Sequence, residues 1–182
     1  MRKLKLQVQI TIDGFIGGMK GELDFMEFEW DDQLKQYIQE LTESVDCIIL
    51  GRKLAEGFIP YWASHPQEEG ADRINKMKKI VFTKTLEVSP WENTVLAKGD
   101  LIEEVAKLKN QDGKDIIVYG GAGFVSALLQ HRLIDELHLL VNPTAIGKGL
   151  PIFANVGEKL SLQLVQSTSY ACGIAVLHYD LK

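Results

Sequence analysis

Residues 116–123 read Ile116-Ile117-Val118-Tyr119-Gly120-Gly121-Ala122-Gly123, an apolar run that ends in a glycine-rich turn. A short run of β-branched residues predicts a buried strand, and residues 124–130 continue with helical spacing. Glycine lets a ligand approach the backbone, and a helix N-terminus offers unpaired N–H groups. The strand–turn–helix unit is therefore typical of phosphate binding, although a tight turn without a ligand also explains the glycines.

Two other stretches follow the same design. The apolar run 47–50 leads into Gly51-Arg52-Lys53, and a strand predicted over 79–82 leads into Thr83-Lys84-Thr85. In an α/β sheet, ligands bind at the edge where the parallel strands end. Cations and hydroxyl groups at two such ends, with Gly-Gly at a third, predict a site for a multiply phosphorylated nucleotide. Taken singly, the cations are also typical of solvated helix ends, and the threonines of turns.

The remaining pattern predicts an α/β fold. The first two-thirds of the chain alternates strand and helix, which favours parallel pairing, and the last quarter is strand after strand. We therefore expect one domain over residues 1–182, with a mixed, mainly parallel sheet flanked by helices and an antiparallel C-terminal hairpin. The expected strands cover 3–12, 47–50, 79–82, 95–97, 116–119, 136–142, 160–167 and 173–181. One helix is expected to begin at Trp30-Asp31-Asp32. Three more are expected over 53–58, 101–108 and 124–130, and Pro60 should end the first of these three.

Composition excludes several classes of protein. The chain has 182 residues, 46% of them hydrophobic and 25% charged, and a net charge of −5. This acidic balance disfavours a partner made of nucleic acid, and no apolar run is long enough for a membrane span. Two cysteines, Cys47 and Cys172, are typical of a reducing compartment, so we expect a cytoplasmic protein. The four histidines lie apart without metal-ligand spacing, and no metal site is predicted.

These motifs resemble those of dihydrofolate reductase-like proteins. The resemblance rests on Gly51-Arg52-Lys53, on the strand that ends in Thr83-Lys84, and on the turn from Gly120 to Phe124. A closer similarity is to the reductase domain of the bifunctional riboflavin-biosynthesis deaminase–reductase and its stand-alone relatives. It is carried by residues 11–14, 120–129, 133–137 and 143–149, so it extends over most of the chain.

The resemblance implies NADPH as hydride donor and a small-molecule substrate, and it favours a homodimer. It places the phosphates and the adenosine ribose at the loops after residues 51 and 82, and the nicotinamide near the end of the first strand. The cofactor-binding residues that it implies are Ile12, Gly14, Gly51, Arg52, Lys53, Thr83, Lys84, Gly120, Gly121, Ala122, Gly123 and Phe124.

Two positions depart from the riboflavin reductases. Those enzymes typically have a lysine where this chain has Phe15 and a glutamate where it has Tyr119. Both are polar groups near a ribosyl-phosphate substrate, so their loss should weaken recognition of a charged substrate. Phe15, Tyr119 and Trp30 are the substrate-binding residues that we expect, and a flat aromatic substrate could stack on such rings. Closure of the core by these rings is the alternative interpretation.

Reduction of a C=N bond also needs a proton, for which a carboxylic acid is useful. Asp13, next to the predicted nicotinamide site, is the candidate catalytic residue, although it also suits a turn. Asp31 and Asp32 are better explained as caps of the helix that follows them. The leading hypothesis is an NADPH-dependent reductase of a pterin-like or pyrimidine heterocycle, including the 5-amino-6-ribosylamino-uracil phosphate type. The alternative is a nucleotide-binding sensor with lost or weak catalysis.

Overall fold

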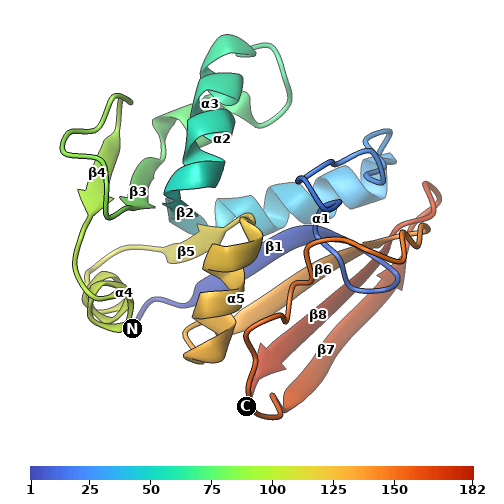
Figure 1. Cartoon of the computed structure of the whole chain (residues 1–182). Coiled ribbons are helices and arrows are strands. Elements are labelled where there is room, and N and C mark those ends of the chain that lie inside the picture. The colour runs from blue at the N-terminus through green and yellow to red at the C-terminus, as the bar shows by residue number, and fades with distance from the viewer.

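The computed structural model describes all residues from Met1 to Lys182 as one eight-stranded sheet with helices on both faces (Figure 1). The strands are β1 (Leu4–Thr11), β2 (Val45–Gly51), β3 (Lys78–Phe82), β4 (Thr94–Ala97), β5 (Asp115–Val118), β6 (Glu136–Asn142), β7 (Leu162–Ser169) and β8 (Ala175–Leu181). The helices are α1 (Asp32–Glu43), α2 (Arg52–Ser64), α3 (Ala71–Lys76), α4 (Leu101–Lys109) and α5 (Ala122–Gln130). None of these helices is long and apolar enough to cross a membrane.

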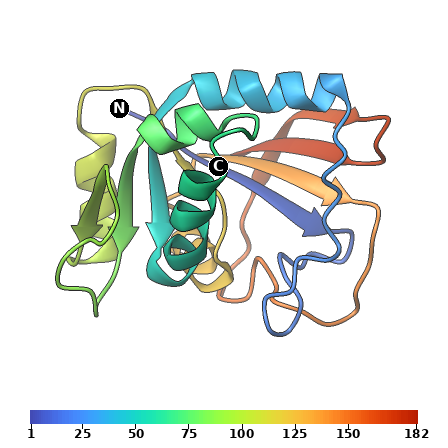
Figure 2. The same cartoon turned by 90° about the horizontal axis from the view of Figure 1, so that it is seen from above.

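The first six strands in the order of the sheet, from β4 to β6, are parallel, and the last two strands pair antiparallel with their neighbours. The strand order is β4-β3-β2-β5-β1-β6-β8-β7, and only the last two pairings are antiparallel. The predicted mixed, mainly parallel sheet with an antiparallel C-terminal hairpin is therefore confirmed. Because the six parallel strands run the same way, their carboxyl ends fan out along one edge of the sheet (Figure 2).

The central strands are apolar on both faces because both faces are covered. Ile116 and Val118 of β5 belong to the core cluster that α4 and α5 supply, whereas Ile117 belongs to the cluster of α2 and α3. Successive strand residues point to opposite faces, so a continuous apolar run fills two layers. Burial of such a strand on both sides explains why the sequence shows a solid apolar block at 116–118.

β1 differs, because one of its buried faces is polar. Leu4, Leu6, Val8 and Ile10 lie in the core cluster with α4 and α5, as their alternation predicts. Ile12 follows the end of the strand and is 67% exposed. The opposite face carries side chains that are also buried, on the side of the sheet covered by α1: Gln7, Gln9 and Thr11.

The prediction that Pro60 ends the helix after Gly51 is wrong. α2 continues to Ser64 with Pro60 inside it, rather than ending near residue 58. A proline inside a helix removes one backbone hydrogen bond, to the carbonyl four residues earlier. That carbonyl belongs to Glu56, which is exposed, so water can satisfy it. The buried side of α2, at Ala55 and Ile59, continues to pack across the proline.

Both chain ends lie at the edge opposite to the carboxyl ends of the parallel strands. β1 begins at Leu4, beside the start of β6, and the antiparallel β8 returns to that edge. There the Leu181 N–H donates to the Asp135 carbonyl at 2.9 Å. In Figure 2 the N-terminus lies on the opposite side of the sheet from the arrowheads of the cyan and green strands, β2, β3 and β4.

Candidate functional site

The three phosphate-type motifs come together where the parallel strands β3, β2 and β5 end. We call this row of strand ends the candidate edge. β3, β2 and β5 are adjacent, with Gly51 paired to Phe82 and Ile49 paired to Val118. The loops that begin at Gly51, Thr83 and Tyr119 therefore leave the sheet side by side. The strands before Arg52 and Thr83 are direct neighbours, paired in parallel.

Two helices begin at this edge without a side-chain cap. The N-caps of α2 and α5 are Gly51 and Gly121, neither makes a side-chain cap hydrogen bond, and neither first turn holds an acidic residue. By contrast, Asp31 and Asp100 accept backbone N–H groups at the starts of α1 and α4. A helix N-terminus combines unpaired N–H donors with partial positive charge, which favours an anion. The two uncapped ends follow adjacent strands, an arrangement that suits a pyrophosphate.

The turn between β5 and α5 requires glycine. Gly120 and Gly121 have φ angles of +151° and +85°, a region that residues with a side chain rarely adopt. Gly51 has an ordinary φ of −76°, but a Cβ there would lie 3.0 Å from the Cβ of Phe124. The Phe124 ring in turn contacts the Phe82 ring, with centroids 5.1 Å apart. Glycine at residue 51 therefore lets the two helix N-termini approach one another.

The predicted cations lie at this edge, and two of the three, Arg52 and Lys84, already have protein partners. Arg52 pairs with Glu56 one turn later at 2.6 Å, and Lys53 beside it is exposed. The Lys84 ammonium group donates to the carbonyls of Lys98 and Gly99, both at 3.0 Å. Lys84 thereby links the loops after β3 and β4, so its position is defined by the backbone.

The hydroxyl group of Thr83 has a turn-forming role. Its Oγ1 accepts the N–H groups of Thr85 and Leu86, each at 3.1 Å. Such a bond pattern stabilises a turn directly after a strand. The alternative interpretation of these threonines as turn formers therefore describes their contacts in this structure, while Thr83 remains at the candidate edge.

Asp13 holds the loop after β6 against the end of β1. Its carboxylate accepts the N–H of Gly147 at 2.7 Å and the N–H of Ile146 at 3.3 Å. Nearby, the Ile12 N–H donates to the Thr144 carbonyl at 2.9 Å, and Gly14 takes a φ of +84°. A hydrogen bond from the Thr11 side chain, supported by these two N–H groups, lowers the pKa of Asp13. An ionised carboxylate accepts protons rather than donating them.

The three expected substrate residues pack in different places. Phe15 pairs through its backbone with Pro151, and Trp30 packs against the cluster of Leu34 and Leu140. Tyr119 stacks on Phe58 of α2, with ring centroids 5.4 Å apart. The buried hydroxyl group of Tyr119 has no hydrogen-bond partner, and burial raises its pKa. Only Tyr119 directly precedes the glycine turn of the candidate edge.

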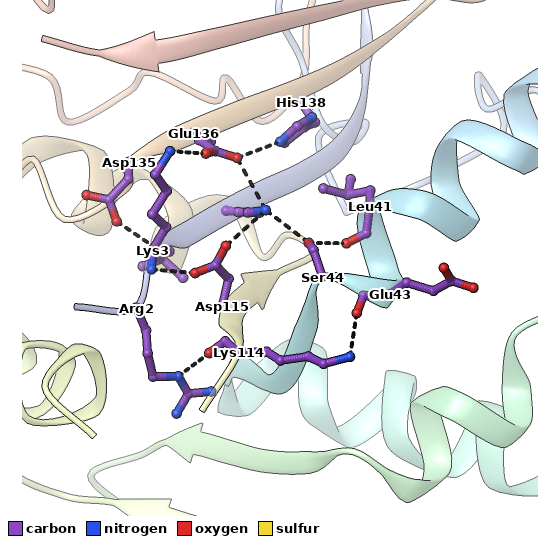
Figure 3. Close-up of polar contacts among 12 residues, drawn as sticks. Arg2, Lys3, Leu41, Glu43, Ser44, Lys114, Asp115, Asp135, Glu136 and His138 are labelled. Carbon is purple, nitrogen blue, oxygen red and sulfur yellow. Dashed lines mark hydrogen bonds and ion pairs between the residues drawn. The ribbon is translucent and has the colours of Figure 1, made fainter. Parts of the chain in front are cut away.

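A second polar cluster lies at the starts of the strands, and sequence reasoning missed it. Figure 3 shows Glu136 between Lys3 and His138, near Asp115 and Ser44. Lys3 lies 2.5 Å from one carboxylate oxygen of Glu136, and His138 lies 3.4 Å from the other. The sequence signal was the polar alternation Glu136 and His138 inside a strand that is otherwise apolar.

The same cluster brings together two histidines that are 40 residues apart in the sequence. His138 and His178 are directly opposite on β6 and β8, and their ring centroids lie 4.1 Å apart. On the other side of His138, the Tyr37 hydroxyl group lies 2.6 Å from its Nδ1. The interpretation of the histidines as scattered therefore does not hold for this pair, because strand pairing places them side by side.

The cluster also perturbs its own titratable groups. A hydrogen bond from His138, followed by Lys3 and the charge of Lys5, lowers the pKa of Glu136. Burial raises the pKa of the Tyr37 hydroxyl group, and burial lowers the pKa of His178 with help from His138. Glu136 is thus an ionised carboxylate in a largely buried setting.

Comparison with known proteins identifies relatives over most of the chain. The Bacillus subtilis (strain 168) protein YyaP, which is uncharacterised, is 30% identical over 98% of this chain and 94% of its own length. Riboflavin biosynthesis protein RibD of Corynebacterium ammoniagenes is 25% identical over 80% of this chain and 44% of its own length.

Solved structures share the fold. A Shewanella sp. PV-4 protein assigned provisionally to riboflavin biosynthesis superposes with a TM-score of 0.77 at 22% identity, covering 100% of this chain and 99% of that one. A second structure superposes with a TM-score of 0.71 at 19% identity, covering 100% of this chain and 57% of that one. It is the Thermotoga maritima diaminohydroxyphosphoribosylaminopyrimidine deaminase/5-amino-6-(5-phosphoribosylamino)uracil reductase.

The family model of the RibD C-terminal domain matches residues 2–176, which is nearly the entire chain. The resemblance to riboflavin-type reductases is therefore confirmed, and with it the dihydrofolate reductase-like fold. This family is associated with reductase activity and normally with NADPH. The chain belongs to the RibD C-terminal domain family.

Proposed function

We propose that this chain is an NADPH-dependent reductase of a small heterocycle. The observation that carries the proposal is the pair of helix N-termini, on adjacent strands, that begin with glycine and lack any side-chain cap. Membership of a reductase family and the cations beside these helix ends support it. NADPH supplies a hydride, while the chain binds and orients NADPH and excludes water from the reacting atoms.

The roles of the residues follow from their positions along the edge. The N–H groups after Gly51 and Gly121 receive the pyrophosphate, and Lys53 adds positive charge beside it. Thr83 and Lys84, together with Arg52 on the neighbouring strand end, form the side that receives the 2′-phosphate. Residues 120–124 cover the nicotinamide side, which Ile12 and Gly14 border at the end of β1.

The substrate that we propose lacks a ribosyl phosphate. Phe15 and Tyr119 stand where riboflavin reductases have a lysine and a glutamate, so two charged contacts to such a substrate are missing. A polar contact that a pocket cannot offer discriminates strongly against a substrate that requires it. An uncharged heterocycle, of the pterin or pyrimidine kind, suits apolar side chains better.

A matched pair of variants at Gly123 tests the cofactor site. Residue 123 is exposed in the first turn of α5, and a Cβ there meets nothing within 4 Å. Gly123→Asp favours the helix dipole but repels a phosphate, so it should weaken NADPH binding by about tenfold or more without loss of stability. Gly123→Asn is the neutral control. Calorimetric titration that gave Gly123→Asp the wild-type affinity would contradict the proposal.

The contacts of Asp13 favour a second candidate function, a nucleotide-binding protein without efficient catalysis. The carboxylate is committed to two backbone N–H groups and its pKa is lowered, so it is a poor proton donor. The two functions differ in one measurement, the oxidation of bound NADPH when heterocycles are added. Oxidation with turnover supports the reductase, and tight NADPH binding without oxidation by pterins or pyrimidines supports the second function.

A further inference from the structure

A second group of side chains capable of binding a ligand lies far from the candidate edge. Glu136, His138 and His178 project from the same face of β6 and β8, the face covered by α1. His138 lies four residues before Asn142, the last residue of β6, which is about 13 Å at ~3.3 Å per residue. This group is therefore separate from the cofactor site, and nothing in the proposed reductase function uses it.

The spacing of the three side chains suits a single ion. Their ligand atoms all lie within 4.8 Å of one another, with Glu136 Oε2 at 3.4 Å from His138 Nε2 and 3.9 Å from His178 Nε2. Metal–ligand bonds of ~2.0–2.2 Å in a tetrahedral site separate the ligand atoms by about 3.3–3.6 Å. One of the three separations already fits, and a rotation of the His178 ring would bring its Nε2 nearer to Glu136 Oε2.

The surroundings prepare both imidazoles for this role. The Tyr37 hydroxyl group occupies Nδ1 of His138 at 2.6 Å, which leaves Nε2 for another partner. An outer hydrogen bond of this kind fixes the orientation of a ligand histidine. Nε2 of His178 is buried and has no hydrogen-bond partner. A buried polar atom without a partner costs stability, which an ion at this position would offset.

Lysines are the main competitors for Glu136. Lys3 occupies its Oε1 at 2.5 Å, and Lys5 lies 3.5 Å from the Oε2 that an ion would share. Lys5 has other partners, however: Asp115 at 3.0 Å and the Ser44 hydroxyl group at 2.9 Å. It can therefore move toward Asp115 and remain paired, while its charge keeps the affinity for a cation moderate.

We propose that Glu136, His138 and His178 form a binding site for one divalent transition-metal ion of the Zn²⁺ type. Two imidazoles and a carboxylate are the ligands that Zn²⁺ takes in proteins, with one coordination position left for water. In the bound form His138 carries its proton on Nδ1 and donates it to the Tyr37 oxygen, so Nε2 ligates the ion. The ion clamps the antiparallel β8 to the parallel part of the sheet.

Metal titration of the tag-free protein tests the site without any use of NADPH. Isothermal titration with Zn²⁺ should show one equivalent bound. Co²⁺ bound in its place should give the visible absorption bands of a four-coordinate site. His178→Ala should weaken binding by about tenfold or more, in line with the loss of one ligand. His131→Ala, which removes an exposed histidine elsewhere, is the matched control and should bind as the wild type does.

Three outcomes are decisive. Lys5→Met removes the competing charge and should tighten Zn²⁺ binding, so an unchanged or weaker affinity would contradict the placement of the ion on Oε2. The absence of stoichiometric binding by the wild type, or equal binding by His178→Ala, would overturn the site. His178 is more exposed than His138 and lies on β8, one strand from the edge of the sheet, so this variant should fold even where a His138 variant does not.

Discussion

Gly51 and Phe124 pack so closely that a Cβ added at residue 51 would lie 3.0 Å from the Cβ of Phe124. The contact joins the start of α2 to the first turn of α5 across the adjacent strands β2 and β5. The φ of Gly51 is ordinary, so the need for glycine is steric. This contact sets how near the two uncapped helix ends can lie.

Gly51→Ala should therefore destabilise the protein by about 1–3 kcal/mol, the usual effect of overpacking. Gly57→Ala is the matched control, because residue 57 lies inside α2 and a Cβ there meets nothing within 4 Å. That control should stabilise the protein by about 0.5–1 kcal/mol, the helix preference of alanine over glycine. Urea unfolding measures both, and equal effects of the same sign would refute the steric explanation.

Arg52→Ala should weaken NADPH binding by about ten- to a hundredfold and NADH binding much less, since a hydrogen bond to a charged group contributes ~1.5–3 kcal/mol. Lys84→Ala should likewise weaken NADPH binding more than NADH binding. It should also loosen the loop after β4, because the Lys84 side chain donates to the carbonyls of that loop. Glu56→Gln, which releases Arg52 from its ion pair, should tighten NADPH binding. The effects on NADPH should shrink at high salt.

Calorimetric titration with both nucleotides decides this prediction. Lys76→Ala is a control for surface charge, because it breaks a similar exposed pair with Asp72 at the far end of α3. If both test variants lose NADPH and NADH equally, these residues serve the shared pyrophosphate or the fold, and the assignment to the 2′-phosphate fails.

The substrate of riboflavin synthesis should be a poor one for this chain. Phe15 and Tyr119 replace a cation and an acid that would contact the ribosylamino-pyrimidine phosphate, so we expect turnover well below the usual enzyme range of ~1–10³ s⁻¹. Steady-state oxidation of NADPH with that compound is the measurement. A rate inside the usual range would contradict our interpretation of the two positions.

Asp31 should make the start of α1 sensitive to acid. Its carboxylate accepts the Leu34 N–H at 2.9 Å and the Cys172 N–H at 3.2 Å, and the hydrogen bond from Leu34 is the main cause of its lowered pKa. Because the folded pKa lies below the unfolded one of about 3.9, the stabilisation is present above pH ~4 and is lost as the pH falls below it.

Asp31→Asn keeps an acceptor but removes the ionisation, so its melting temperature should fall less steeply than that of the wild type between pH 5 and pH 3. Asp32→Asn, the adjacent first-turn position, removes a charge without touching the two cap hydrogen bonds and serves as the control. Thermal melts across this range are the measurement. Parallel curves for Asp31→Asn and the wild type would show that the cap contributes nothing through its charge.

We predict a homodimer of twice the 20.4 kDa chain mass. The family resemblance motivates this prediction, and the edge strand β7 supports it, because Leu164 and Val165 are 52% and 51% exposed there. An open strand edge with exposed apolar side chains readily pairs with another chain. Light scattering at micromolar concentrations is the measurement, and a mass equal to one chain would refute the prediction.

Much of the fold could be predicted because its signals are local. The apolar blocks at 47–50 and 116–118 identify strands buried on both faces, and Asp31 marks the start of α1 by its capping chemistry. The Gly-Gly pair after β5 has the positive φ angles that only glycine tolerates easily. These features depend on a few neighbouring residues, so a single sequence carries them.

The rest depends on which segments meet in space. Neither Tyr37 nor His178 is near His138 in the sequence, and only the packing of α1 and the register of β8 bring them together. The polar side of β1 could be taken for a solvated face, although Gln7 and Gln9 are buried. Pro60 misled the prediction of α2 because the helix tolerates one lost hydrogen bond on its exposed side.

The position of the chain ends has a consequence for how this fold can be combined with others. Both termini lie at the starts of the parallel strands, while the candidate cofactor edge lies at their ends (Figure 2). A segment joined at either end therefore extends away from Gly51, Gly121 and Lys84. A module of this shape can be appended to another catalytic unit, or attached to a solid support, while the candidate cofactor edge stays open to solvent.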